Sequence, residues 1–182
     1  MTNSFYSEEE LALMGFKAIG RNCKISRKAS FYSIQDISVG NNVRIDDFCI
    51  LSGNIVLGNN IHISAYVALY GAMGIELEDY TGISSMSTVY SAMDDFSGDY
   101  LIGPVHPHEY TNVTGGKVTI KRYSQVGANC IVFPNLMIGE GCAIGACSMV
   151  RNSLESWGIY WGMPVERHKN RSKKMLTFLN EE

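Results

Sequence analysis

The chain has 182 residues, of which 46% are hydrophobic and 18% charged, and its formal net charge is −3. This length fits one domain with terminal additions. The slight negative charge offers no basic patch for phosphates, which argues against nucleic-acid binding, and no apolar run is long enough to span a membrane. The acidic N-terminal segment is untypical of a signal peptide, so we expect a cytoplasmic protein.

A short helix is predicted near the N-terminus. Ser7 followed by Glu10 has the spacing of a capping box. We therefore expect an amphipathic helix over residues 7–15, within an N-terminal helical segment of residues 1–18.

From Ile19 onward an apolar residue recurs every six positions along most of the chain. This period matches neither a helix nor the simple alternation of a strand. It is typical of a short strand and a turn repeated many times, which is a β-solenoid of the hexapeptide class. Cysteine or serine often follows four positions later, where we expect buried small residues. The clearest run is Ile120, Val126, Val132, Ile138, Ile144 and Val150.

The fold predicted from this pattern is all-β, a parallel β-helix over residues 19–157. Three hexads close one triangular coil, and each coil buries its apolar column on the next. Two-residue slips, between Ile37 and Val39 and between Leu69 and Leu77, predict outward bulges at one corner. After Val150 the pattern stops. We expect residues 158–164 to be irregular and residues 167–182 to form a helix that covers the open end, within a C-terminal segment of residues 158–182.

The hexad pattern is interrupted by a loop of residues 95–117. This segment holds half of the four prolines and two of the four histidines. Loops carried on rigid scaffolds often hold functional residues, so the loop is a candidate for the functional region.

The repeats IKRYSQ-VGANCI-VFPNLM-IGEGCA-IGACSM-V, followed by WGIYWGMPVERH, resemble the C-terminal signature of the left-handed β-helix hexapeptide-repeat acyltransferases. The resemblance covers residues 19 to about 170. It is nearest to the branch that acetylates sugars, namely galactoside and maltose acetyltransferases and the sugar acetyltransferases of bacterial surface-polysaccharide clusters. It implies an acetyl-CoA-dependent acetyltransferase for an amino or hydroxyl group of a deoxy or nucleotide-linked sugar, as in lipopolysaccharide and O-antigen biosynthesis. It also implies a homotrimer with active sites between subunits.

Small residues in successive layers suit the thin pantetheine arm of CoA, which needs a groove of exposed solenoid backbone. By the residues alone, the same glycines and alanines could simply form corners of the coil. The resemblance implies that the Gly-Met-Pro segment surrounds the CoA and that two basic residues meet its phosphates. The cofactor-binding residues predicted in this way are Gly127, Ala128, Gly145, Ala146, Ser148, Gly162, Pro164, Arg167 and Lys169.

Asp94 stands where the resemblance implies a histidine general base. A carboxylate can take that role only if burial or a like charge raises its pKa, and Asp95 supplies a like charge. Asp94 and Asp95 could instead bind the sugar or be solvated loop residues. His62 and His108 are alternative bases, because the ordinary pKa of histidine suits proton abstraction at neutral pH.

Ser84 and Tyr90, together with Asp95, are the predicted acceptor-binding residues. An amine acceptor needs less help from a base than a hydroxyl, so the absent histidine favours N-acylation without deciding it.

Two other classes stay open at this point: a non-catalytic trimeric solenoid scaffold and a γ-carbonic-anhydrase-like metalloenzyme. The latter needs three histidines on adjacent coils, and their spacing here predicts no metal site.

Overall fold

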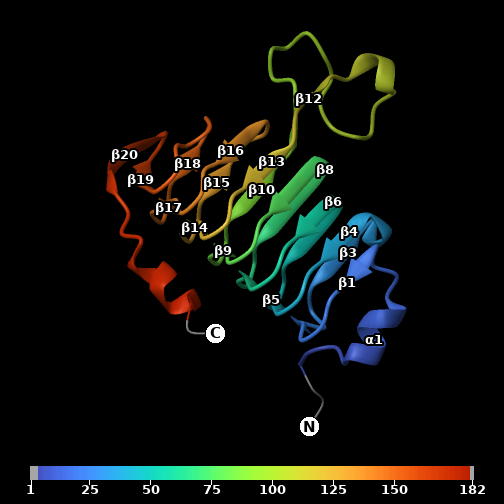
Figure 1. Ribbon diagram of the computed structural model, residues 1–182. Helices are drawn as coiled ribbons and strands as arrows, with labels where there is room; N and C mark the ends of the chain where they lie inside the picture. The colour runs from blue at the N-terminus through green and yellow to red at the C-terminus, as the bar shows by residue number, and fades with distance from the viewer. Residues whose placement is uncertain (1–3, 181–182) are drawn as a thin grey trace.

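The computed structural model describes residues 4–180, which wind into a three-sided parallel β-solenoid (Figure 1). Wall 1 contains β1 (Ala18–Ile19), β4 (Ile37–Val39), the second halves of β6 (Ile50–Leu57) and β8 (Ala68–Leu77), β13 (Val118–Ile120) and β16 (Leu136–Ile138). Wall 2 contains β2 (Lys24–Ile25), β5 (Val43–Ile45), β7 (Ile61–Ile63), β9 (Gly82–Ile83), β14 (Gln125–Val126), β17 (Ala143–Ile144) and β19 (Gly158–Gly162). Wall 3 contains β3 (Ser30–Tyr32), the first halves of β6 and β8, β10 (Thr88–Tyr90), β15 (Ile131–Val132) and β18 (Met149–Val150).

The hexad residues form the core of the solenoid, as predicted. All members of the clearest run, from Ile120 to Val150, are at most 3% exposed. The cysteines and serines four positions later are buried beside them at the corners, including Ser124 and Cys142. Each coil therefore presents an apolar layer to the coils above and below it, and burying that layer is what holds the stack together.

The strand register shows two outward bulges, and the first lies just before Ile37 rather than between Ile37 and Val39 as predicted. Ala18 pairs with Ser38, and the extra residues form the 3₁₀ turn η1 (Ile34–Asp36). In the β6–β8 pair, the partners shift between Gly53 and Ile55, so the second bulge lies just before Ile75. The other coils keep their apolar columns aligned because these insertions bulge outward at a corner.

The interrupting loop forms an arm that projects from the corner between walls 3 and 1 (Figure 1). Its base is an antiparallel pair of β11 (Ala92–Asp94) and β12 (Val113–Gly115), and its tip holds the 3₁₀ turn η2 (His108–Tyr110). The irregular arm thus leaves the coil through a short hairpin that begins three residues before the predicted boundary.

The N-terminal helix is confirmed as α1 (Glu8–Leu13), with both hydrogen bonds of the Ser7–Glu10 capping box present. The prediction for the C-terminal segment is wrong in two respects. Residues 158–170 are not irregular or helical, because β19 adds a layer to wall 2 and pairs antiparallel with β20 (Val165–Asn170). β20 thus covers the outer edge of β19 on wall 2.

The only helical part after β20 within the described residues is the 3₁₀ segment η3 (Lys174–Asn180). It does not cover the open end of the solenoid. Met175 and Leu179 instead lie beside Tyr80 and Tyr123 at the corner between walls 1 and 2. The side chain of Arg171 anchors the segment there by donating hydrogen bonds to the carbonyl oxygens of Tyr123, Gly141 and Cys142.

Replacing Ile83 by alanine should destabilise the protein by about 2–5 kcal/mol, because it opens a cavity in the middle of the stacked core. Val56→Ala is the matched control, since Val56 faces outward on wall 1 and is 41% exposed. Urea unfolding at equal protein concentration measures both variants. Equal losses of unfolding free energy in the two would contradict this description of the core.

Candidate functional site

A stripe of small side chains, called the furrow below, runs along the corner between walls 2 and 3. The backbone N–H of Ser84 donates to Val126 O, that of Gly127 to Ile144 O, and that of Gly145 to Tyr160 O, at distances of 2.9, 2.9 and 2.8 Å. Ser84, Gly127 and Gly145 therefore stand one above another on successive coils. Ser85, Ala128 and Ala146 form a second column beside them.

Glycine at position 127 is required by the stacking itself. A Cβ atom there would lie 2.7 Å from Ala146 N and from Ile144 O. On the next coil, Trp161 occupies the position directly beside Gly145, and a Cβ on Gly145 would lie 3.0 Å from the Trp161 Cβ. The large Trp161 side chain therefore marks the end of the furrow. Coils stack about 4.8 Å apart, so Ser84 and Trp161 are separated by roughly 14 Å.

Trp161 was missed by the sequence analysis. Its ring stacks on His168 of β20 with centroids 3.3 Å apart, so the hairpin fixes the end of the furrow. The only sequence signal was the WGMP segment itself, in which the tryptophan precedes the predicted Gly162.

The predicted cofactor-binding residues divide into three groups. Gly127, Ala128, Gly145 and Ala146 line the furrow. Ser148 does not: it is 2% exposed, and its Oγ accepts a hydrogen bond from Gly162 N at 3.2 Å, so it supports the β19–β20 turn from inside. Gly162 and Pro164 belong to the turn between β19 and β20. The predicted phosphate ligands Arg167 and Lys169 lie on β20 beyond that turn. Arg167 forms an ion pair with Glu155 at 2.5 Å.

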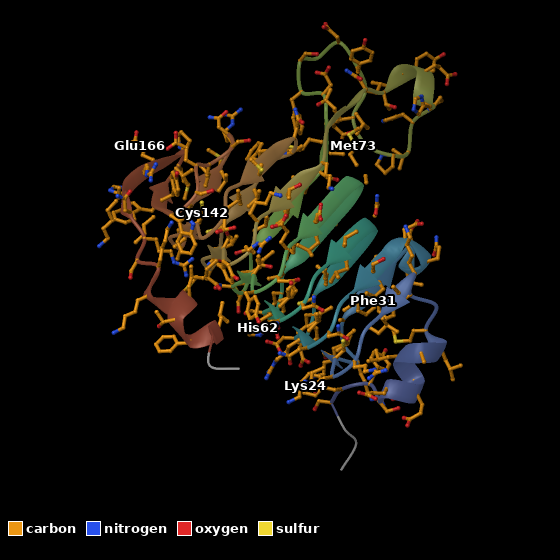
Figure 2. All side chains as sticks on the ribbon, viewed as in Figure 1. Lys24, Phe31, His62, Met73, Cys142 and Glu166 are labelled. Carbon is orange, nitrogen blue, oxygen red and sulfur yellow. The ribbon has the colours of Figure 1, made fainter. Side chains whose placement is uncertain are left out.

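Polar residues of wall 2 border the furrow near Ser84. Gln125 Nε2 donates to Ser84 Oγ at 3.2 Å. One coil below Gly82, His62 Nε2 lies 2.8 Å from Asp46 Oδ2, and Arg44 Nε donates to Asp46 Oδ1 at 2.7 Å. His62, which Figure 2 labels, is therefore held by a carboxylate rather than left free on the wall.

The partners of Asp46 decide its charge. Burial alone would raise the pKa of this carboxyl, but the hydrogen bonds from His62 and Arg44 outweigh that effect and lower the pKa below its ordinary value. Asp46 is thus an ionised anchor that holds two basic side chains on wall 2.

Asp94 lies elsewhere, at the base of the arm. With Phe96, Phe133 and Arg151 among its neighbours, it lines a hollow of about 470 Å³ at the corner between walls 3 and 1. Asp95 is engaged within the arm, where it accepts hydrogen bonds from Ser97 N and Asn112 Nδ2 at 2.7 and 2.9 Å. Hydrogen bonds from Ser97, then from Asn112, lower the pKa of Asp95, so this carboxylate is ionised and supports the arm.

The remaining predicted residues are spread over wall 3 and the arm. Tyr90 stacks on Tyr70 with ring centroids 5.3 Å apart. His108 is exposed on the arm. Wall 3 separates Ser84 from Asp94 within one chain, and at the rise of a β-strand their separation is roughly 15–20 Å. One chain alone does not bring these two residues into a single site.

The cysteines behave as structural residues. Cys23, Cys49, Cys130 and Cys142 are buried, and Cys147 is exposed. Burial raises the pKa of the Cys49 thiol to about 11, which disfavours the nucleophilic thiolate. Within residues 4–180, no group of three or more His, Cys, Asp or Glu side chains could hold a metal ion, and no helix is long and apolar enough to cross a membrane.

Known proteins similar to this chain are acyltransferases. The dTDP-4-amino-4,6-dideoxy-D-glucose acyltransferase of Escherichia coli is 43% identical over 176 residues, which cover 95% of this chain and 92% of that protein. The D94N variant of AntD, an N-acyltransferase from Bacillus cereus, was solved with dTDP and coenzyme A. It is 54% identical, with a TM-score of 0.96 and coverage of 98% of this chain and 97% of that chain. No protein-family model matches the sequence.

Other AntD structures contain 3-hydroxybutyryl-CoA with dTDP, or, in the S84A variant, dTDP-4-amino-4,6-dideoxyglucose with coenzyme A. This chain also has an aspartate at position 94 and a serine at position 84. The likenesses favour an acyltransferase over the scaffold and metalloenzyme alternatives.

The lowered pKa of Asp46 makes a prediction about acid stability. A carboxyl whose pKa is lower in the folded state adds stability above its unfolded pKa, and this is lost as the pH falls through the folded value. The wild-type protein should therefore lose more unfolding free energy than Asp46→Asn between pH 5 and pH 2, which lie about either side of the ordinary value. Urea unfolding across this range measures the difference. Asp99→Asn, on the exposed arm, is the control, and parallel loss in wild type and Asp46→Asn would contradict the assignment.

Proposed function

Because this chain belongs to the left-handed β-helix hexapeptide-repeat acyltransferases and is an acyl-CoA-dependent sugar acyltransferase, we propose that its acceptor is the 4-amino group of a dTDP-4-amino-4,6-dideoxy sugar. The relative of known activity at 43% identity and the AntD complexes support this acceptor. The observation that carries the proposal is the furrow with Ser84 at one end, at a position also substituted in AntD. Incorporation of the acylated sugar into a surface polysaccharide follows from the branch that the sequence resembles.

The furrow is the proposed binding site for acyl-CoA. Its small side chains leave room for the pantetheine arm, and its roughly 14 Å length is comparable to that of the arm. The thioester would lie at Ser84, and the adenine end would lie near the β19–β20 turn with Arg167 and Lys169. AntD was solved with coenzyme A and with 3-hydroxybutyryl-CoA, which supports an acyl-CoA donor without restricting it to acetyl.

Wall 3 is the proposed trimer interface. It carries outward apolar side chains, with Tyr32 59% and Ile131 43% exposed. Wall 2, in contrast, presents the polar side chains of Arg44, His62 and Gln125 to the outside. A threefold axis facing wall 3 would set the furrow corner of one copy beside the arm corner of the next.

This arrangement would complete the active site. Ser84 of one copy would face Asp94 of the partner subunit. At each interface, the furrow corner of one copy would meet the arm corner of the next. The sugar would enter between the arm and the Asp46–His62 cluster. Arg44, which uses only its Nε on Asp46, would then offer hydrogen bonds to the diphosphate.

The proposed reaction is a direct acyl transfer. The amine nitrogen attacks the thioester carbonyl carbon, the N–C bond forms, and the C–S bond breaks to release the CoA thiol. The amine must lose a proton, and Asp94 would hold the amino group and accept that proton. His62 forms a hydrogen bond with Asp46, and His108 lies on the arm away from the furrow corner. Both histidines are therefore weaker candidates for the base than Asp94.

Asp94→Asn should lower kcat/KM for dTDP-4-amino-4,6-dideoxyglucose by about 10²-fold or more, the usual size of a general-base effect. Binding of acyl-CoA should be unchanged, because Asp94 lies outside the furrow of its own chain. Thiol release from acetyl-CoA measures the rate, with His108→Asn as the control. If Asp94→Asn kept full activity and His108→Asn were inactive, the general base would be His108 and not Asp94.

Ala146→Trp should abolish acyl-CoA binding while leaving the coil folded, because Ala146 is exposed in the furrow. Ala18→Trp, at an exposed outward position on wall 1, is the matched control. Isothermal titration calorimetry with coenzyme A measures both variants. Normal affinity in a folded Ala146→Trp protein would show that the furrow is not the CoA site.

A further inference from the structure

The side chain of Gln125 has an unusual position on wall 2. Gly82 and Gln125 are paired on adjacent coils, and a Cβ at Gly82 would lie 2.4 Å from Gln125 Oε1. The Gln125 amide therefore lies across the space that glycine leaves. From there its Nε2 donates to Ser84 Oγ at 3.2 Å and to Val126 O at 3.3 Å.

This contact determines how the Ser84 hydroxyl is used. A serine hydroxyl has one proton to donate and two lone pairs that accept. Gln125 fills one lone pair, and within residues 4–180 no group accepts the Ser84 hydroxyl proton. The proton is thus available to a ligand in the furrow.

Gln125 also borders a hollow on its other side. Together with Tyr80, Tyr123 and Met175, it lines a hollow of about 250 Å³ beneath the C-terminal segment. The side chain of Arg171 holds that segment by donating a hydrogen bond to Tyr123 O at 2.7 Å. Because the Gln125 side chain is exposed, its orientation is set by its hydrogen bonds to Ser84 Oγ and Val126 O.

We propose that Gln125 is a positioning residue that makes Ser84 a hydrogen-bond donor to the thioester carbonyl oxygen. This inference rests on the proposed function. As the amine attacks, the carbonyl oxygen gains negative charge, and a donor already aimed at it stabilises that charge without reorganisation. Ser84 keeps its proton while the N–C bond forms and the C–S bond breaks, so no acyl-serine is formed.

The test compares Gln125→Leu, which removes the amide, with Gln125→Glu, which keeps the shape but replaces the donor by an acceptor. Both should lower kcat about tenfold, the effect expected for loss of one neutral hydrogen bond, and leave the KM for acetyl-CoA within about twofold. In a Ser84→Ala background neither change should lower kcat further, because Gln125 acts through Ser84. Gln35→Leu, at an exposed site, is the control.

A second readout does not require turnover. Infrared spectra of bound acetyl-CoA labelled with ¹³C at the thioester carbonyl should show a lower carbonyl frequency in wild type than in Ser84→Ala or Gln125→Glu. Wild-type enzyme that binds acetyl-CoA with this shift but does not acylate the amino sugar would refute the proposed acceptor alone. Unchanged kcat and carbonyl frequency in a folded Gln125→Glu, or equal losses in both backgrounds, would overturn the positioning role. Should Gln125→Leu not fold, the isosteric Gln125→Glu decides.

Discussion

The register in which one coil stacks on the next is the constraint on which the rest of this structure depends. Apolar side chains such as Ile83, Val126 and Ile144 must superpose to bury one another, and a slip of one residue would turn them outward. The same register aligns the outward positions into columns. The furrow is therefore a by-product of core packing, and Gly127 is required within it because a Cβ there would collide with the next coil.

Much of the fold could be predicted from the sequence because the core repeats with a simple period. The hexads located the buried residues, and their slips indicated both bulges, the first slightly too late in the chain. Contacts between neighbouring coils were harder to predict from the sequence. Gln125 and Ser84 are 41 residues apart, and they are seen to be neighbours only when the residues of the arm are skipped in aligning the coils. β19 and β20 were missed because they continue wall 2 without the hexad pattern. Ser148 was misassigned to the cofactor although its place four positions after Ile144 already predicted burial.

The separation of Ser84 from Asp94 explains why an apolar wall and a projecting arm occur in the same chain. Each residue sits at one edge of wall 3, so in the proposed enzyme a single copy would carry two half-sites that face away from each other. Association through wall 3 would bury its tyrosines and isoleucines and join the half-sites in one step. In the proposed enzyme, the acyl donor then belongs to the furrow of one subunit, and the amine is held by the arm of the next.

Complementation between two impaired variants tests this shared site most directly. Ser84→Ala and Asp94→Ala chains would be co-expressed with different tags, and trimers that contain both would be purified and assayed by thiol release with dTDP-4-amino-4,6-dideoxyglucose. The purified mixed trimers should restore roughly a third of wild-type activity, because one of the three interfaces in each mixed ring has both residues intact. Mixed trimers no more active than either variant alone would contradict a site built from two subunits.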